Sequence, residues 1–473
     1  MTRIQHEKAP TSSVMTSPGR LRLMAFTVAS AAFITSLTQA LVVPVLPGLP
    51  RELGVSASTA SWLVTVTVVV GAVANPLLGR LGDQYGRKRM LVLAIGAFVL
   101  GSLICAATSD LSLLLVGRAI QGLSTASIPL GIGVMAQILP GTRRAAGIAL
   151  VSAMLGIGGA VGLPLAGLIA GRWGLAGVFG TSAVTGVLVL VATVCLVPDV
   201  RPETREREVD WTGGVLLAVA LVATLIPMSQ GATWGWGSPA TLGLLVAAVL
   251  LLPAFCVLEL RTAHPIVDVR LAVLRPTLLT NVAALALGGA FFLSFLSANT
   301  LFQLPTSAPN GFGRTVVEAG LLMLPGGAAV AAAAPLATRL ISRHGARFAL
   351  LVACLTVAAG FVLEFIPSVE IWQIVLSNVV VSAGIGVAYS AMPALILDTS
   401  PADQAAAASG VNALARNFGS ALGSAFFGMY AASALIGPAG LTVLNIVGAT
   451  AAVGALLATV AIPRSEPSFR QLA

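Results

Sequence analysis

Two arginines stand inside long apolar runs, where their charge gives them the most distinctive chemistry. Arg118 lies in the run that begins near Leu111, and Arg416 lies in the run that begins near Gln404. Placing an arginine at membrane depth costs at least about 2.5–3.5 kcal/mol, so such a residue usually binds, relays or balances charge. The two arginines therefore predict a function that involves charge within an apolar layer.

Side chains suited to making and breaking bonds are scattered. His6, His264 and His344 fall in polar segments, and the cysteines stand singly in apolar runs, at Cys105, Cys195, Cys256 and Cys354. Metal sites and disulfide frameworks need paired or clustered ligands. A membrane-embedded enzyme would need His, Asp or Cys residues that converge near one face. We expect no metal, no cofactor and no enzymatic activity.

The composition identifies the elements that must position the two arginines. Charged residues make up 9% of the 473 residues, where a soluble domain carries about 25%, and the mean hydropathy is +0.97. A helix needs about 20 mostly apolar residues to cross a bilayer. Breaking the chain at charged, Pro and Gly clusters predicts fourteen such helices, among them 145–170 and 176–197. The fold class is an all-α membrane protein.

The basic residues fix the predicted topology. Of the 26 Lys and Arg residues, nearly all lie in the two tails and in alternate loops, whereas the opposite loops hold only Arg51, Arg172 and Arg314. Cytoplasmic loops carry such an excess, so both termini are predicted to be cytoplasmic. We interpret the net charge of +9 as contact with anionic lipid, not with nucleic acid.

The longest polar breaks divide the chain. They predict a cytoplasmic tail (1–21), a six-helix bundle (22–197), two inserted spans with flanking loops (198–277), a second six-helix bundle (278–463) and a cytoplasmic tail (464–473).

An internal repeat supports two related halves. Residues 76–88 read PLLGRLGDQYGRK and residues 335–347 read PLATRLISRHGAR. Pro, Leu, Arg, Leu and Gly recur in register, with Ser342 in place of Asp83. Repeated halves are typical of transporters.

The first copy resembles the signature loop of the major facilitator superfamily, glycine-x-leucine-x-aspartate-x-x-glycine-arginine-lysine. The resemblance implies a conformational switch at Gly79, Arg80, Asp83, Gly86, Arg87, Lys88 and Arg89. The glycines permit a tight turn, and the aspartate can face a helix N-terminus or an arginine.

Two further stretches are similar to motifs of that superfamily. The stretch around Arg118 resembles its fourth-span motif, which implies proton coupling by Arg118, Gln121 and Gly122. The fifth predicted span resembles the antiporter motif, which implies close helix packing at Gly158, Gly162, Pro164 and Gly167. It departs from that motif because proline follows Gly162 by two positions and Ala166 replaces a glycine, so uptake by symport stays open.

The chain as a whole resembles the fourteen-span drug:proton antiporter branch, including a thirteenth span with Arg416, Gly419 and Gly423. Thr38 stands where many members of that branch have an embedded aspartate, so the residue that carries the proton is left open. The family's arrangement implies a cavity lined by spans one, four, nine and twelve. Besides Arg118 and Gln121, its candidate residues are Thr38, Gln39, Ser294, Asn299, Asn378, Ser382 and Tyr389.

The resemblance implies a secondary active transporter of the bacterial cytoplasmic membrane. It would export small hydrophobic or amphipathic compounds, with protons as the coupling ion, as a monomer within the lipid bilayer. A proton-coupled uptake symporter and a lipid or glycolipid flippase on the same fold are the alternatives.

Overall fold

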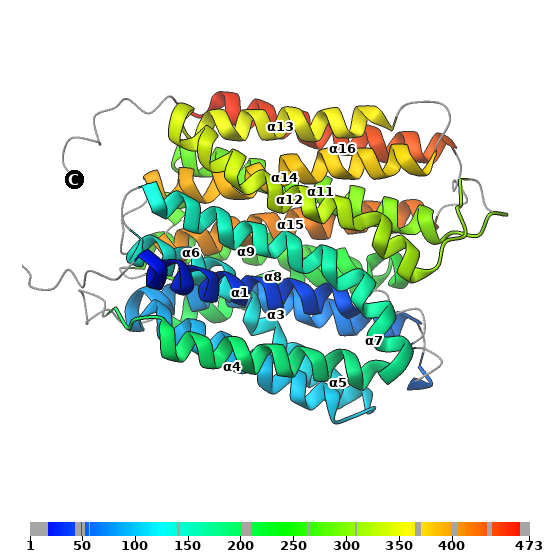
Figure 1. The fold of residues 1–473 in the computed structure, drawn as a ribbon, viewed down its shortest axis with the longest axis horizontal. Coiled ribbons are helices and arrows are strands. Elements are labelled where there is room, and N and C mark those ends of the chain that lie inside the picture. The colour runs from blue at the N-terminus through cyan, green and yellow to red at the C-terminus, as the bar shows by residue number, and fades with distance from the viewer. Residues whose placement is uncertain are drawn as a thin grey trace, which may run out of the picture.

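The computed structural model describes residues 18–42, 49, 53–55, 57–139, 142–200, 210–262, 265–267, 269–307, 310–364, 370–399, 405–432 and 438–463. In these residues the only regular secondary structure is helical, as the sequence predicts (Figure 1). The helices run roughly parallel to one long axis, and α1 begins at the same end of the bundle as α16 finishes (Figure 1).

The first half contains six predicted spans. Its helices are α1 (Pro18–Val42), α3 (Ala57–Tyr85), α4 (Arg87–Ala106), α5 (Leu111–Gly122), the 3-10 helix η2 (Leu123–Ala126), α6 (Ser127–Ile138) and α7 (Thr142–Leu196). The fourth predicted span is therefore composite, because α5, η2 and α6 follow one another without a break. The fifth and sixth predicted spans are two helices that share the label α7 and are separated at Gly174, whose φ of 59° is not helical. Glycine lacks the Cβ that disfavours this conformation, so the chain turns there with almost no loop.

The middle and second half supply the remaining helices. They are α8 (Trp211–Trp234), α9 (Pro239–Arg261), α10 (Val269–Ala272), α11 (Arg275–Gln303), α12 (Val316–His344), α13 (Ala346–Leu363), α14 (Ile371–Thr399), α15 (Ala405–Ala432) and α16 (Pro438–Ala461). Several begin with a cap that their sequence specifies. Asp210 accepts a hydrogen bond from Gly213 N at 2.8 Å, and Thr315 with Glu318 forms a capping box on α12.

Twelve helical stretches of the described residues are long and apolar enough to cross a membrane. The first part of α7 and α15 are helical but fall outside this set. The second of these carries Asn412, Arg416 and Asn417, which lower its hydropathy. A multi-pass membrane fold is thus confirmed, whereas the count of fourteen spans stays a prediction. The exposed surface of these helices is apolar, as at Val249, which is 71% exposed, because lipid surrounds it.

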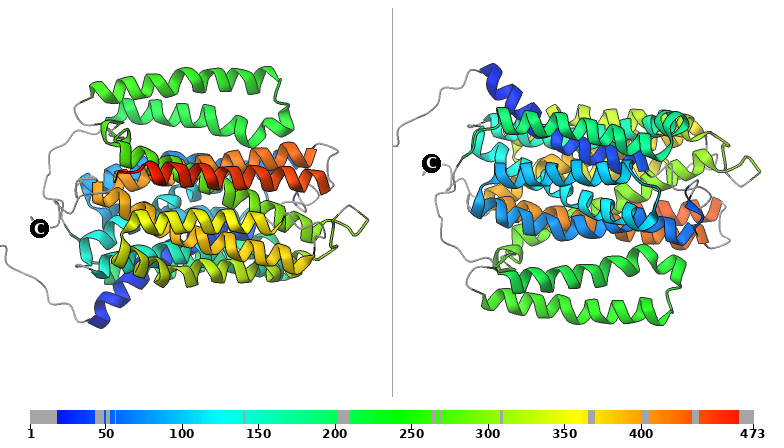
Figure 2. Two further views of the ribbon diagram at one scale, coloured as in Figure 1. Left: turned by 90° about the horizontal axis from the view of Figure 1, so that it is seen from above. Right: turned by 90° about the horizontal axis from the view of Figure 1, so that it is seen from below.

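Each half packs around cores of its own. One buried cluster joins α1, α3, α4, α6 and α7, and another joins α11 to α14 with α16. The two halves meet where α7 packs against α12 and where α3 packs against α15. The inserted helices α8 and α9 lie outside both bundles, beside that second contact, and Figure 2 shows them as a separate green layer. The predicted domain boundaries stay a prediction.

Candidate functional site

The predicted switch segment is a tight turn between α3 and α4 that a buried ion pair closes. Asp83 accepts hydrogen bonds from Nε and Nη2 of Arg87, both at 2.8 Å, and the two side chains are only 2% and 3% exposed. Arg87 also donates through Nη1 to the carbonyl of Gly133 on α6 at 3.0 Å. Gly86 joins the helices with a φ of 106°, which favours glycine. Releasing this turn would break several charge-assisted bonds together.

Two cations beyond the turn hold the end of α7. Lys88 Nζ donates to the carbonyl of Val194 at 3.0 Å, and Arg89 pairs with Asp199 at 3.2 Å. The first contact places a positive charge at the negative end of a helix, which is favourable. The second is exposed and contributes little.

The second half repeats this arrangement. Arg347, which aligns with Lys88, donates to the carbonyls of Thr459 and Val460 near the end of α16, at 3.2 and 2.6 Å. Gly345 joins α12 to α13 with a φ of 86°. The sequence repeat therefore corresponds to a structural repeat. In each half, a cation binds the C-terminal end of the last helix, which is α7 in the first half and α16 in the second.

Arg118 lies fully inside the first half, and the partners described for it are neutral. Its Nε donates to the carbonyl of Leu63 at 2.8 Å, and Nη1 donates to Gln121 Oε1 at 2.9 Å. Gln121 in turn donates to Ser102 at 2.7 Å, and the ring of Phe179 lies 6.0 Å from the guanidinium carbon. The side chain is 2% exposed. The geometry thus brings two of the predicted coupling residues, Arg118 and Gln121, into one network.

Gly122 ends α5 at a close contact with α3. A Cβ at this position would lie 2.8 Å from Val70 Cβ and 2.9 Å from the Thr67 carbonyl oxygen, so only glycine fits. The 3-10 helix η2 follows at once. In it, Thr125 Oγ1 lies 3.0–3.2 Å from three oxygens: the carbonyls of Gly71 and Gly122 and the side chain of Asn75.

The glycines of the fifth predicted span bring α7 against α1. A Cβ on Gly158 would lie 2.5 Å from the Phe33 carbonyl oxygen, and one on Gly162 would lie 2.8 Å from that of Leu37. This is the small-residue packing that the sequence predicts. The other two residues of this motif, Pro164 and Gly167, also lie within α7.

Arg416, in the second half, stacks on an aromatic ring. Its guanidinium carbon lies 4.6 Å from the ring centroid of Tyr389 on α14, which is a cation–π contact. Gly419 and Gly423, one and two turns later, lie against the backbone of α11 near Gly289. Three predicted residues of α15 thus fix its contacts with α11 and α14.

The cavity candidates differ in their immediate surroundings. Thr38 is 2% exposed and donates to Ser182 on α7 at 3.0 Å, whereas the neighbouring Gln39 is exposed. Asn299 is half-buried and accepts a hydrogen bond from Gln303 at 2.9 Å. Thr38 and Asn299 thus bond to nearby groups, and residue type alone did not distinguish the buried Thr38 from the exposed Gln39.

The remaining candidates lie between helices of the second half. Asn378 and Ser382 both point at Gly326 on α12, where the Ser382 hydroxyl oxygen would lie 3.1 Å from an added Cβ. They therefore line the contact between α12 and α14. Ser294 on α11 is buried, at 4% exposure.

Sequence comparison now decides the family. The Major Facilitator Superfamily profile matches residues 28–424 and also residues 286–471. The chain belongs to the major facilitator superfamily. It is therefore a transporter and not an enzyme, and it handles small-molecule substrates within a bilayer.

Three proteins show how this facilitator relates to others. It is 28% identical over 400 residues to the multidrug resistance protein Stp of Mycobacterium tuberculosis (strain CDC 1551 / Oshkosh), covering 84% of this chain and 73% of that protein. It is 27% identical to the tetracenomycin C resistance and export protein of Streptomyces glaucescens, covering 86% and 75%. The crystal structure of the human organic anion transporter MFSD10 shares the fold, with a TM-score of 0.66, 16% identity and coverage of 95% and 100%.

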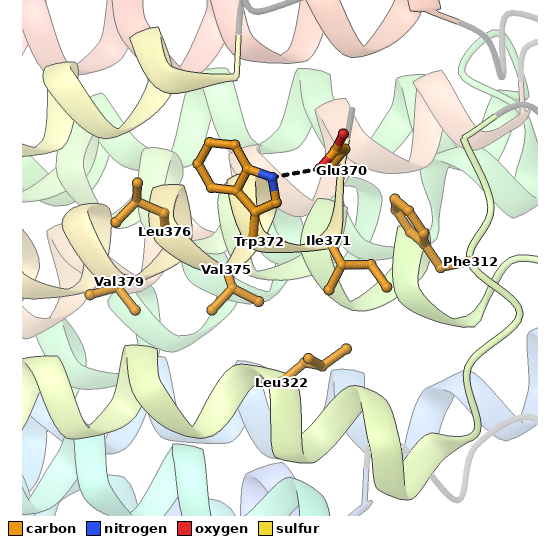
Figure 3. A pocket seen from close by; sticks show the side chains of 8 residues that line it. All are labelled: Phe312, Leu322, Glu370, Ile371, Trp372, Val375, Leu376 and Val379. Carbon is orange, nitrogen blue, oxygen red and sulfur yellow. Dashed lines mark hydrogen bonds between the residues drawn. The ribbon is translucent and has the colours of Figure 1, made fainter. Parts of the chain in front are cut away.

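An apolar groove opens near the first residues of α12 and α14 in this facilitator. Its volume is about 860 Å³, and Figure 3 shows the side chains that line it: Phe312, Leu322, Glu370, Ile371, Trp372, Val375, Leu376 and Val379. The indole of Trp372 donates to Glu370 at 2.6 Å and is 57% exposed. Leu376 is also exposed, and the lining other than Glu370 is apolar, which suits contact with lipid acyl chains.

The sequence did not reveal the neighbours of three polar residues, Ser102, Ser182 and Glu364. Ser102 accepts a hydrogen bond from Gln121, the partner of Arg118, and Ser182 accepts one from Thr38. Both serines stand among apolar residues, and nothing in the sequence indicated these partners. Glu364, at the C-terminal end of α13, is half-buried beside Ser377 and Asn445. Burial raises the pKa of Glu364, and the neighbouring side chains of Ser377 and Asn445 oppose the rise.

Proposed function

We propose that this facilitator exports small hydrophobic or amphipathic compounds, of the drug or antibiotic kind, in exchange for protons by alternating access. The observation that carries the proposal is the buried network of Arg118, Gln121 and Ser102. A cation at this depth is expensive, and its neutral partners leave its charge available to a proton-linked step. Two relatives with names that state drug resistance or export support the cargo class.

The direction of transport is supported by the packing of α1 on α7. Gly158 and Gly162 bring the two helices to backbone contact, as the antiporter motif would require. A potential of about 100 mV supplies roughly 2.3 kcal/mol per charge, enough for a gradient of roughly forty-fold at 1.4 kcal/mol per tenfold. A concentration gradient of this size can be built without a nucleotide. Protons are the proposed coupling ion.

The proposed setting is the bacterial cytoplasmic membrane, with both termini on the cytoplasmic side and the protein acting as a monomer. The excess of basic residues in alternate loops supports this orientation.

Growth of an efflux-deficient bacterium on a panel of toxic compounds tests the proposal. Wild-type protein is expected to protect against some of them, and Arg118→Ala is expected to lose that protection at equal membrane content. Arg314→Ala is the matched control, because Arg314 is exposed and its contact with Glu318 is long, at 4.0 Å. Equal protection by Arg118→Ala and wild type would contradict the role of the network.

Direction and coupling are measured in inverted membrane vesicles. If the protein exports, a compound against which it protects the cells should accumulate inside the vesicles while the internal pH rises. Accumulation that runs the other way would establish uptake by symport.

The lateral groove favours one second candidate, a lipid or glycolipid flippase. A groove of about 860 Å³ that faces lipid could admit an acyl chain directly from the bilayer. A fluorescent lipid analogue in proteoliposomes distinguishes the two, because only a flippase would move it between leaflets.

A further inference from the structure

The inserted helices α8 and α9 lie on the seam between the two halves. Buried leucines of α8, such as Leu217 and Leu221, pack with Val69 of α3, and the same cluster takes in Leu414 and Phe418 of α15. Since α3 and α15 belong to different halves, any movement of the halves obliges the inserted pair to follow one of them. The structure shows which of the two it is tied to.

At the outer end, polar contacts tie α8 to α3. The hydroxyl oxygens of Thr65 and Ser229 lie 2.6 Å apart, and Gln230 Nε2 donates to Thr65 Oγ1 at 3.0 Å. The rings of Trp62 and Trp234 pack beside them with centroids 6.0 Å apart. Hydrogen bonds between membrane helices contribute about 0.6–2 kcal/mol each, and they fix the register of the pair.

At the cytoplasmic end, two carboxylates meet above Gly213. A Cβ on Gly213 would lie 2.5 Å from Asp210 Oδ2 and 2.6 Å from Glu259 Oε1, so only glycine leaves room for them. The two oxygens are therefore no more than about 5 Å apart, a separation at which like charges disfavour joint ionisation. Glu259 is 2% exposed, so either a bound proton or a neighbouring positive charge must offset this repulsion and the loss of water.

A positive charge of the switch segment acts on this carboxylate. Arg80 on α3 interacts electrostatically with Glu259. Arg80 itself is buried, at 6% exposure. The cytoplasmic end of α9 is thus coupled electrostatically to α3, three residues before Asp83.

The contact with α15 is of a different kind. The residues of α15 in the shared cluster, Val411, Leu414, Phe418 and Ala421, are apolar. Apolar contact has no preferred direction, so it allows one surface to slide along another while the area stays buried.

We propose that α8 and α9 travel as part of the first half, with Glu259 and Asp210 as positioning residues for Arg80, while α15 moves past their apolar face. The proposal rests on the alternating access of the proposed function. It assigns the inserted pair a mechanical place in the transport cycle.

Distances between spin labels test this directly. Three exposed outer positions are changed to cysteine in a background without native cysteines: Ser109→Cys in the first half, Gly237→Cys between α8 and α9, and Ser307→Cys in the second half. An added Cβ on Gly237 meets nothing within 4 Å. Electron–electron distances are measured in lipid nanodiscs at acidic and at alkaline pH.

The distance from Ser109 to Gly237 is expected to stay constant, while the distances from Ser307 to both others shift together. A constant Gly237–Ser307 distance with a shifting Gly237–Ser109 distance would overturn the proposal and attach the pair to the second half. A constant Ser109–Ser307 distance would instead refute alternation itself, so the two failures are distinguishable.

A second measurement tests the positioning role. Labels at Arg261→Cys on α9 and Arg144→Cys on α7 report the cytoplasmic end. Glu259→Gln keeps the shape of the side chain but removes its charge, so the distance distribution is expected to broaden. Glu370→Gln, an exposed carboxylate at the outer end, is the matched control and should leave the distribution unchanged. An equally narrow distribution in Glu259→Gln would show that the charge does not hold α9 to α3.

Discussion

The contact between α1 and α7 should be sensitive to a single methyl group. Gly158→Ala places a Cβ 2.5 Å from the Phe33 carbonyl oxygen and 3.0 Å from both Leu37 N and Ser36 Cβ. Two of these three atoms belong to the backbone of α1, which cannot rotate away as a side chain would. The helices must therefore separate over this contact.

The size of the effect follows from this geometry. Overpacking a well-packed contact costs about 1–3 kcal/mol, and the rigid backbone partners place Gly158→Ala toward the upper value. At about 2–4 °C per kcal/mol, thermal unfolding in detergent should occur several degrees lower than in wild type. Gly162→Ala meets the Ala40 Cβ at 2.5 Å and should cost a similar amount. The double variant should cost less than the sum, because one separation of the helices relieves both clashes.

A glycine elsewhere in α7 gives the control. Gly180 has no atom within 4 Å of an added Cβ, so Gly180→Ala should leave the unfolding temperature unchanged or raise it, since alanine favours the helix. If Gly158→Ala and Gly180→Ala unfold at the same temperature, the backbone contact of α1 and α7 does not exist as described.

Three other predictions address charge, backbone and pH. Arg118→Lys should abolish transport at unchanged protein level, because one ammonium cannot reproduce the forked guanidinium contacts. Lys88→Arg should be tolerated in the same drug-protection assay, because Arg347 holds the matching position of the second half. Gly345→Ala should lower stability by about 1–2 kcal/mol because its φ is 86°, while Gly96→Ala, with open space around it, should not; thermal unfolding measures both. Burial raises the pKa of Glu364, so the folded protein binds the carboxyl proton more tightly than the unfolded chain and loses stability as pH rises from about 4.5 through the raised pKa. Glu364→Gln should remove this loss of stability, which is measured as the unfolding temperature against pH. Coinciding curves for wild type and Glu364→Gln would contradict the prediction.

The features that the sequence predicted well depend on local rules. The turn at Gly86 needs a glycine followed by cations, and the repeat at Gly345 has the same need, so both were visible as residue types in register. A buried Arg118 was equally visible, because charge in an apolar run is rare. Small residues spaced by four, as at Gly158 and Gly162, indicated a close helix contact, although not that α1 is the partner.

The features that sequence missed depend on tertiary partners. Polar residues at helical spacing show that a helix has a polar face, but Thr38 reaches Ser182 on a helix far along the chain, while Gln39 next to it is exposed. The meeting of Asp210 and Glu259 could not be predicted either, since it requires α8 and α9 to pack side by side.

The short 3-10 helix within the fourth span couples the length of that span to its rotation. A 3-10 helix rises about 2.0 Å and turns about 120° per residue, against about 1.5 Å and 100° for an α-helix. Winding the four residues of η2 at α-helical pitch would therefore shorten the span by about 2 Å and rotate α5 by about 80° relative to α6. Arg118 lies one turn before η2, and Thr125 holds the present winding through its oxygen partners on α3. Exchange of a few hydrogen bonds at one threonine would thus swing a buried positive charge around the helix axis without bending the helix.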